Sequence, residues 1–318
     1  MQRTALITGA AGQDGHYLAE LLLERDYRVF GLIRRSSQGK SVPPGIEVVE
    51  GDVTDAGGMM RLFRQTQPDE VYHLAAQSHV GLSFDLPRPT FEVNTLGCIN
   101  VLEAARLYGA RMFQASTSEM YGNSGGPLTE TSPFRPVSPY GSSKLAAHQL
   151  CWQFRRGYGQ FVSCGIMFNH ESPRRGVDFV TQKIATGVAR IQAGYEEQIV
   201  LGNIEVARDW SHARDCMRAA WLMLQQDQPD DFVVASGTPH TIGDFLAAAW
   251  GPDWRRIVTT DEALYRPIEV RTLCGDSSSA RQVLGWQPEI TFESLVREMV
   301  SAAASRLKRQ ETRTDGDA

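Results

Sequence analysis

Three glycines between residues 9 and 15 restrict the fold of this chain more than any other feature. A short apolar run at residues 4–8 ends at Gly9, Gly12 and Gly15 follow, and apolar residues then recur with helical spacing over residues 16–23. Glycines let the backbone approach a ligand closely, and free N–H groups at a helix start favour an anion. The stretch therefore predicts a strand, a turn and a helix that hold a pyrophosphate, although a tight turn alone also fits three glycines.

Alternation of apolar strands with amphipathic helices continues through the first half of the chain. Strands are predicted at residues 27–33, 46–53, 70–78 and 111–116, and a helix at residues 94–106. This pattern predicts an α/β fold, a Rossmann-like doubly wound parallel sheet with right-handed crossovers. The pattern changes after residue 165, which predicts a smaller C-terminal α/β portion.

This change in the sequence pattern predicts three segments. Residues 1–165 would bind the dinucleotide and carry the catalytic side chains. Residues 166–306 would mainly bind the substrate, with the chain free to cross back to the sheet. Residues 307–318 are polar and charged, which predicts a disordered tail.

The second predicted strand ends in Arg34, Arg35 and Ser36, where such folds meet the adenine ribose. An acidic residue there would accept from a 2′-hydroxyl, whereas guanidinium groups and hydroxyls suit a 2′-phosphate, so NADP is favoured over NAD. A solvated basic turn is the alternative. We expect further cofactor contacts from the ends of the third and fourth strands and from the glycine turn; these residues are Gln13, Asp14, Asp52, Val53, Leu74, Ala75, Ala76 and Gln77.

Four side chains form the candidate reaction centre: Thr117, Glu119, Tyr140 and Lys144. Thr117 and Glu119 follow a predicted strand, and active sites of open parallel sheets lie at the carboxyl ends of strands. Tyr140 and Lys144 share one face of a helix, where a nearby cation favours the phenolate and makes it a usable base. A chance helical pair and a surface carboxylate are the alternatives.

Composition excludes several classes of protein. The net charge of -5, with scattered Lys and Arg, argues against nucleic-acid binding by bulk charge. The five cysteines lie far apart without metal-ligand spacing, so we expect buried thiols in a reducing compartment and no metal site. Neither a signal peptide nor a membrane helix is recognisable, so the cytoplasm is the expected location.

Taken together, these residues resemble an extended short-chain dehydrogenase/reductase, and longer strings resemble the GDP-mannose 4,6-dehydratase family along nearly the whole chain. The strings that carry this likeness are residues 7–9, 12–15, 34–37, 74–78, 116–119, 168–176, 208–210 and 222–227. The resemblance implies that hydride passes from C4 of a hexose to NADP, that water is lost across C5 and C6, and that hydride returns to C6.

The resemblance also implies a role for each catalytic residue. Tyr140 would take the proton of the C4 hydroxyl, Lys144 would hold the phenolate and the nicotinamide ribose, and Thr117 would hydrogen-bond the C4 oxygen. Glu119 would remove the C5 proton and protonate the departing C6 hydroxyl, a step that an epimerase or a reductase does not need. Substrate contacts are expected from Ser78, Thr117, Ser118, Glu119, Asn169, Lys183, Arg208, Arg266 and Glu269.

Other interpretations stay open at this stage. The substrate-binding charges also fit structural ion pairs, and His170 and His212 are interpreted as structural. The loop at residues 38–45 is shorter than in the family, where it reaches a neighbouring subunit, so a homodimer is expected and a tetramer is the alternative. Residues 91–97, 127–134 and 141–143 differ from the family pattern. Rival functions are a 4,6-dehydratase for another nucleotide sugar such as a GDP-heptose, an epimerase or reductase, and a non-catalytic NADP-binding protein.

Overall fold

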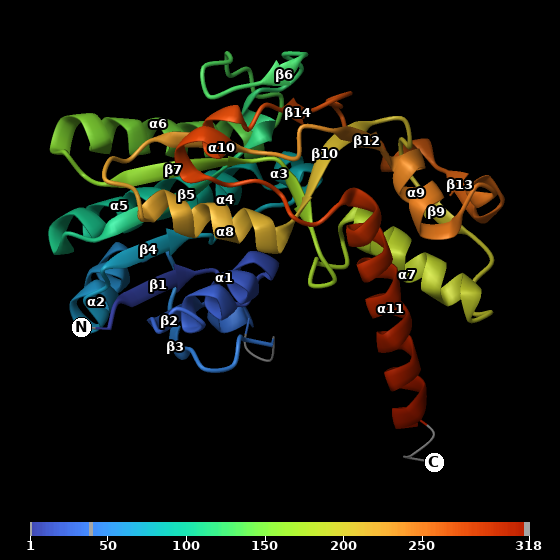
Figure 1. Cartoon of the computed structure of the whole chain (residues 1–318), viewed down its shortest axis with the longest axis horizontal. Helices are drawn as coiled ribbons and strands as arrows, with labels where there is room; N and C mark the ends of the chain where they lie inside the picture. Colours follow the sequence, from blue (N-terminus) through green and yellow to red (C-terminus); the bar gives the residue numbers. More distant parts are fainter. Residues whose placement is uncertain (1, 38–40, 315–318) are drawn as a thin grey trace.

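A computed structural model of the chain describes residues 2–37 and 41–314. Its main element is a seven-stranded sheet, parallel throughout, in the order β11-β7-β5-β4-β1-β2-β3 (Figure 1). The strands are β1 (Thr4–Thr8), β2 (Arg28–Ile33), β3 (Glu47–Glu50), β4 (Glu70–His73), β5 (Arg111–Thr117), β7 (Val162–Met167) and β11 (Asp231–Val234). The order reverses direction between β1 and β4, which is the switch point where such sheets bind ligands. The predicted doubly wound sheet is confirmed.

Helices cover both faces of this sheet. One face packs α1 (Gln13–Leu23), α8 (Ala213–Leu224) and α10 (Ser278–Leu284), and the other packs α2 (Ala56–Thr66), α5 (Gly97–Tyr108) and α6 (Pro139–Tyr158). Strand β1 shows why: Ala5 and Ile7 point into one core and Leu6 into the other, so the middle of the strand is apolar on both sides. The sheet is therefore buried on both sides.

The second half builds a smaller portion beside the sheet (Figure 1). Its elements are β8 (Asn169–Glu171), β10 (Ala207–His212), β12 (Pro239–Thr241), β9 (Ile199–Leu201), β13 (Val258–Thr260), α7 (Val180–Gln192), α9 (Ile242–Trp250) and α11 (Phe292–Thr314). Strands β8, β10 and β12 form one small sheet, and β9 pairs with β13. A separate core, which includes Trp210 and Phe245, holds this portion together. The chain returns to the large sheet with α8, β11 and α10.

Short elements complete the connections. They are η1 (Arg35–Ser37), α3 (Val80–Asp85), α4 (Pro87–Phe91), η2 (Glu92–Leu96), η3 (Ser118–Met120), β6 (Pro127–Leu128), η4 (Trp254–Ile257), η5 (Glu262–Leu264) and β14 (Cys274–Gly275). Strands β6 and β14 pair in parallel. This pair ties the loop after η3 to the chain that leads into α10.

The structure differs from the sequence-based expectation at three ends. Strand β3 ends at Glu50, before the predicted residue 53, because its partner β2 ends at Ile33. Strand β4 ends at His73, before the predicted residue 78, because its partner β1 ends at Thr8. Helix α11 continues to Thr314, into the segment predicted as a disordered tail. Residues 38–40, within the loop predicted to be short, and residues 315–318 lie outside the described part.

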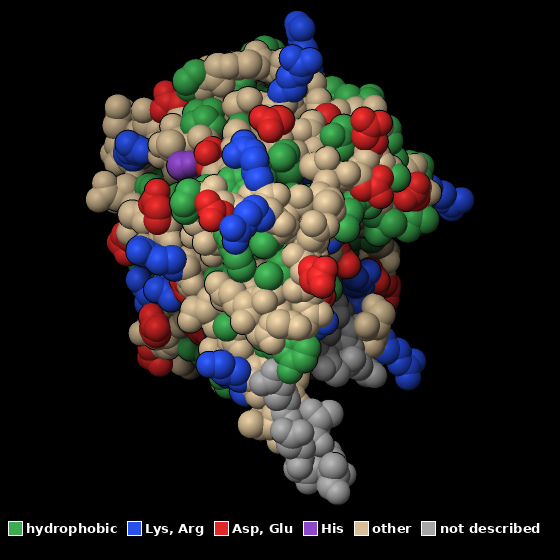
Figure 2. Space-filling view, turned by 90° about the vertical axis from the view of Figure 1, so that its right-hand side faces the viewer, with side chains coloured by type: hydrophobic (Ala, Val, Ile, Leu, Met, Phe, Trp, Pro, Cys, Tyr) green, Lys and Arg blue, Asp and Glu red, His purple; other side chains and the backbone are tan. Residues whose placement is uncertain are grey.

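Surface properties of the described residues are mixed. No described helix combines the length and the apolar content that crossing a bilayer requires. On the face formed by the second portion, Lys and Arg side chains are interspersed with Asp and Glu (Figure 2). The described basic and acidic side chains of this face are therefore mixed rather than segregated.

Candidate active site

Strand β5 and helix α6 bring the four predicted catalytic side chains to one place. Thr117 ends β5 and caps η3, which carries Glu119, while Tyr140 and Lys144 lie one turn apart on α6. Helix α6 begins there because Ser138 caps it and Pro139 occupies its first turn. All four side chains are buried, and Thr117 hydrogen-bonds Tyr140. The cluster stands at the carboxyl edge of the sheet.

Burial and neighbouring charges set the protonation of the pair on α6. Burial raises the pKa of Tyr140 to about 12; the hydrogen bond from Thr117 opposes this rise, and the Glu119 carboxylate adds to it. Burial lowers the pKa of Lys144 to about 8, and its Nζ donates to the Ala115 carbonyl at 2.8 Å. At neutral pH Tyr140 is therefore a phenol, and Lys144 remains largely protonated.

Three of the predicted substrate residues gather around Glu119. Arg266 Nη1 lies 3.7 Å from Glu119 Oε1 and 3.8 Å from Glu269 Oε1, and Arg208 Nη2 lies 3.1 Å from the same Glu269 oxygen. Two guanidinium groups thus stand beside the candidate acid/base residue, although residue 266 lies far from residue 119 in sequence. Guanidinium groups suit a diphosphate, because their N–H groups form paired hydrogen bonds with its oxygens.

The other predicted substrate residues are less closely joined to this group. Ser118 is buried in η3, and Asn169 begins β8. Ser78 and Lys183 are exposed, Lys183 on α7. Among the described residues, no hydrogen bond or ion pair links the side chains of Ser78, Asn169 and Lys183 to the four predicted catalytic residues.

The glycines of the turn are required because the turn packs tightly against its own backbone. Gly9 adopts a φ of 76°, which favours glycine, and a Cβ on Gly15 would lie 2.5 Å from the Ala10 carbonyl oxygen. Gly12 precedes α1 and provides no side-chain cap, so the amide groups at the helix start are not satisfied by a capping side chain. This turn lies at the switch point of the sheet.

Gln13 and Asp14 join the glycine turn to the second half of the chain. Gln13 Nε2 donates to the His170 carbonyl at 3.1 Å, Ser172 Oγ donates to Gln13 Oε1 at 2.7 Å, and His170 Nε2 lies 3.0 Å from Asp14 Oδ2. Burial alone would raise the pKa of Asp14, but His170 lowers it below its ordinary value. His170 thus links the two portions, and His212 caps α8.

The residues predicted to meet the adenosine follow β2 and β3. Arg34, Arg35 and Ser36 are exposed, and Arg35 Nε lies 3.8 Å from Glu50 Oε1. Asp52 Oδ1 accepts from the Thr54 amide at 2.9 Å, and the Val53 carbonyl accepts from Asn100 Nδ2 at 2.8 Å. The guanidinium groups are therefore accessible at the carboxyl end of β2.

Asn94 is a buried residue of the site that sequence reasoning missed. Its Oδ1 accepts from the Gln77 amide at 2.8 Å, and its Nδ2 donates to the Gln77 carbonyl at 3.0 Å and to Ser143 Oγ at 3.0 Å. Asn94 therefore fixes the half-buried segment after β4 against α6. The only feature of the sequence that marked Asn94 was an amide side chain at the start of the predicted helix at residues 94–106.

His73, at the end of β4, makes stability depend on pH. Burial lowers its pKa to about 3, and the nearby Lys144 charge adds to this shift. An unfolded chain protonates this histidine below about pH 6.5, whereas the folded chain does so only near pH 3. The free energy of unfolding should therefore fall by about 4 kcal/mol from this group as the pH is lowered from 6.5 to 3.

Chemical denaturation across this pH range would measure the effect by comparing the unmodified protein with His73→Asn. In the unmodified protein, His73 Nδ1 lies 2.8 Å from Thr8 Oγ1, and asparagine keeps a polar group near that hydroxyl. We expect a shallower loss of stability in this variant than in the unmodified protein. His240→Asn, which changes a histidine of the second portion, is the control. Equal slopes for all three proteins would contradict the prediction.

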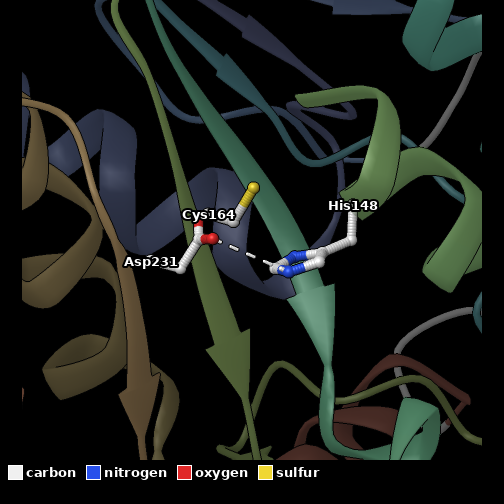
Figure 3. A group of neighbouring side chains, drawn as sticks. All are labelled: His148, Cys164 and Asp231. Carbon is white, nitrogen blue, oxygen red and sulfur yellow. Dashed lines mark ion pairs between the residues drawn. The ribbon is translucent and has the colours of Figure 1, made fainter. Parts of the chain in front are cut away.

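A further group of neighbouring side chains contains the buried residues His148 and Cys164 and the partly buried Asp231 (Figure 3). His148 Nδ1 lies 3.0 Å from Ser116 Oγ, its Nε2 lies 3.7 Å from Asp231 Oδ2, and Arg155 also pairs with Asp231. Burial opposes the charge on His148, but Cys164 and Asp231 raise its pKa above the ordinary value.

These three side chains are of metal-binding types, and their ligand atoms lie within 4.8 Å of one another. However, the Arg155 guanidinium already neutralises Asp231 and would repel a cation. We therefore assign the group a structural role, in which His148 on α6 fixes Ser116 of β5. The spacing of these residues in the sequence formed no recognisable motif.

Comparison with known proteins agrees with this geometry. The family model described as GDP-mannose 4,6 dehydratase matches residues 6–299. GDP-mannose 4,6 dehydratase 1 of Arabidopsis thaliana is 44% identical, over 99% of this chain and 93% of its own length. The UDP-glucose 4-epimerase of Thermus thermophilus, solved with NAD, superimposes with a TM-score of 0.83 at 29% identity, covering 94% of this chain and 98% of its own.

RMD from Pseudomonas aeruginosa, solved with NADPH, superimposes with a TM-score of 0.78 at 25% identity, covering 96% of this chain and 100% of its own. The solved relatives thus share the sheet and the smaller portion, while the sequence match extends over almost every residue. The chain belongs to the GDP-mannose 4,6-dehydratase family.

Proposed function

We propose that this protein is a GDP-mannose 4,6-dehydratase that converts GDP-D-mannose to GDP-4-keto-6-deoxy-D-mannose. One observation carries the proposal: Glu119, a buried carboxylate, lies in one cluster with Thr117, Tyr140 and the substrate-binding arginines. Tyr140 and Lys144 suit oxidation at C4 in any member of the wider group, whereas the elimination of water needs an additional acid/base group. Membership of the family supports the same reaction.

A nicotinamide dinucleotide would occupy the switch point, because the glycines allow the tight turn between β1 and α1 and because α1 begins without a side-chain cap, which leaves its first amide groups for an anion. Solved relatives hold NAD or NADPH. When bound, the cofactor would supply the hydride chemistry, by which C4 is oxidised and C6 is reduced. The proton released from the C4 hydroxyl balances the proton added at C5, so the net change is the loss of one water.

The residues of the chain would perform the proton transfers. Tyr140 is a phenol in the free protein, so it would first have to lose its proton, and Lys144 would stabilise the resulting phenolate. The phenolate would take the proton of the C4 hydroxyl, and Thr117 would donate a hydrogen bond to the C4 oxygen as it becomes a carbonyl. That carbonyl makes the C5 proton acidic. Glu119 would remove this proton and transfer it to the C6 hydroxyl, which leaves as water.

The nucleotide would be held mainly by the second half of the chain. Arg208 and Arg266 would bind the diphosphate and Glu269 a hydroxyl or an edge of the base, with Asn169 and Lys183 as further contacts. We accordingly divide the chain into a cofactor-binding portion at residues 1–165 and a mainly substrate-binding portion at residues 166–306, from which α8, β11 and α10 return to the large sheet.

A homodimer in the cytoplasm is the assembly and location that we propose. Large apolar side chains are exposed on α4, η2, α5 and α6, and these are Phe91, Leu96, Leu107, Trp152 and Tyr158. They lie on helices that cover one face of the sheet, and a second copy would remove them from water. Sedimentation velocity distinguishes a dimer from the tetramer.

The function is tested by incubating the protein with GDP-mannose and catalytic NADP, without added reductant, and following the sugar by NMR. A 4-keto-6-deoxy product supports the proposal. A C4 epimer without loss of water would indicate an epimerase, and stoichiometric consumption of reduced cofactor would indicate a reductase. Absence of product with GDP-, dTDP-, UDP- and CDP-hexoses would reject the dehydratase proposal.

NADP rather than NAD is the cofactor that we propose, and Arg34 and Arg35 provide the test. Changing both to Ser should weaken NADP binding by about 100-fold, because charge-assisted hydrogen bonds to the 2′-phosphate are lost. NAD binding should change by less than about threefold, since it lacks that phosphate. Calorimetric titration of both cofactors measures the difference. Arg28→Ser, at the other end of β2, is the control, and an equal loss for NAD and NADP would contradict the prediction.

A further inference from the structure

A charge cluster lies at the candidate active site and consists of Arg208, Arg266, Glu119 and Glu269. Its two arginines differ in the number of hydrogen bonds that fix them. Arg208 Nη1 donates to the carbonyl oxygens of Ala207 at 2.9 Å and Val270 at 2.8 Å, and its Nη2 pairs with Glu269 at 3.1 Å. Only 6% of its side chain is exposed. Arg208 is therefore fixed by backbone and side-chain partners together.

Arg266 is held more loosely than Arg208. Its Nη1 lies 3.7 Å from Glu119 and 3.8 Å from Glu269, both longer than a hydrogen bond, and 35% of its side chain is exposed. Asn123 anchors the following segment through the Glu269 carbonyl at 3.2 Å and the Arg271 amide at 3.2 Å, but Arg266 lies before these anchors. One guanidinium is thus shared by two carboxylates without close contact to either.

A diphosphate changes this balance. The cluster contains two cations and two anions, so its charges already balance. A bound diphosphate therefore adds negative charge that has no cationic partner of its own. Phosphate oxygens accept paired N–H groups at shorter distances than the present pairs. Arg266, the loosely held cation, is the group that can move to satisfy them.

On this basis we propose that Arg266 is a charge switch, which pairs with Glu119 in the empty site and moves to the diphosphate when the nucleotide sugar binds. The inference rests on the proposed function and adds a regulation of the same site. Glu119 is thus released from its ion pair with Arg266 when substrate is present, and its carboxylate is available for the proton transfers at C5 and C6.

A thermodynamic cycle of GDP affinities tests the switch without any catalytic step. Calorimetric titration with GDP is carried out on the unmodified protein, Glu119→Gln, Arg266→Gln and the double variant. If GDP must separate Arg266 from Glu119, then Glu119→Gln should tighten GDP binding by about fivefold, the value of a partly exposed ion pair. In the Arg266→Gln background the same change should alter affinity by less than about twofold.

Other outcomes overturn the inference. Simple repulsion between Glu119 and the diphosphate would tighten binding equally in both backgrounds, and weaker binding by Glu119→Gln would show that Glu119 orients Arg266 for the ligand. If GDP binds to none of the proteins, the proposed function fails together with the switch. Arg266→Met, with a stem of similar length, replaces Arg266→Gln if that variant does not fold.

Discussion

Glu119→Gln should bind cofactor and GDP-mannose and yet form the 4-keto-6-deoxy product at least about 1,000-fold more slowly than the unmodified protein. Glutamine preserves the shape of the buried side chain, so the fold is retained, but it cannot remove the C5 proton or protonate the C6 hydroxyl. In the proposed mechanism, oxidation at C4 depends on Tyr140, Lys144 and Thr117, and it should continue. NMR of the sugar and the absorbance of reduced nicotinamide follow the two stages separately.

The two readouts make this prediction specific. In Glu119→Gln, absorbance of reduced cofactor should accumulate toward one equivalent per site, because the sugar is oxidised but cannot proceed to the elimination. Glu47→Gln, the same chemical change at an exposed residue of β3 paired with Arg28, serves as the control and should leave both signals unchanged. Product formation by Glu119→Gln at more than about one tenth of the unmodified rate would remove Glu119 from the mechanism.

The sequence predicted those parts of the molecule that depend on local periodicity. Strand β1, the glycine turn and α1 follow directly from an apolar run, three glycines and a helical repeat. The spacing of Tyr140 and Lys144 places them on one face of α6 by helix geometry alone. The rule that parallel strands bring their carboxyl ends to one edge was sufficient to bring Thr117 and Glu119 toward them.

Contacts between distant segments were beyond such reasoning. Asn94 fastens the segment after β4 to α6, and His170 reaches Asp14 across 156 positions in the chain. The pairing of Arg266 with Glu119 depends on how the chain between η5 and β14 returns toward η3, which no local pattern encodes. Strands β3 and β4 were predicted too long for the same reason. The last residue of a strand is set by where hydrogen bonding to the partner strand stops, and not by the residue types.

Tyr140→Phe should abolish both the absorbance of reduced cofactor and the NMR signal of the 4-keto-6-deoxy product. The change removes one buried oxygen, so the helix and its packing are preserved, but the C4 hydroxyl loses the group that takes its proton. We expect a fall of at least about 1,000-fold in product formation, with no accumulation of reduced cofactor, because the step that generates it no longer occurs. Spectrophotometry and NMR on the same samples measure the two effects.

The double variant Tyr140→Phe with Glu119→Gln orders the two residues in the reaction. If C4 oxidation precedes elimination, the double variant should behave like Tyr140→Phe alone, without reduced cofactor, because the later defect is hidden by the earlier one. Tyr195→Phe, which removes the same oxygen from an exposed tyrosine after α7, is the matched control and should keep full activity. Reduced cofactor in the double variant would show that another group takes the C4 proton, and Tyr140 would then be a binding residue.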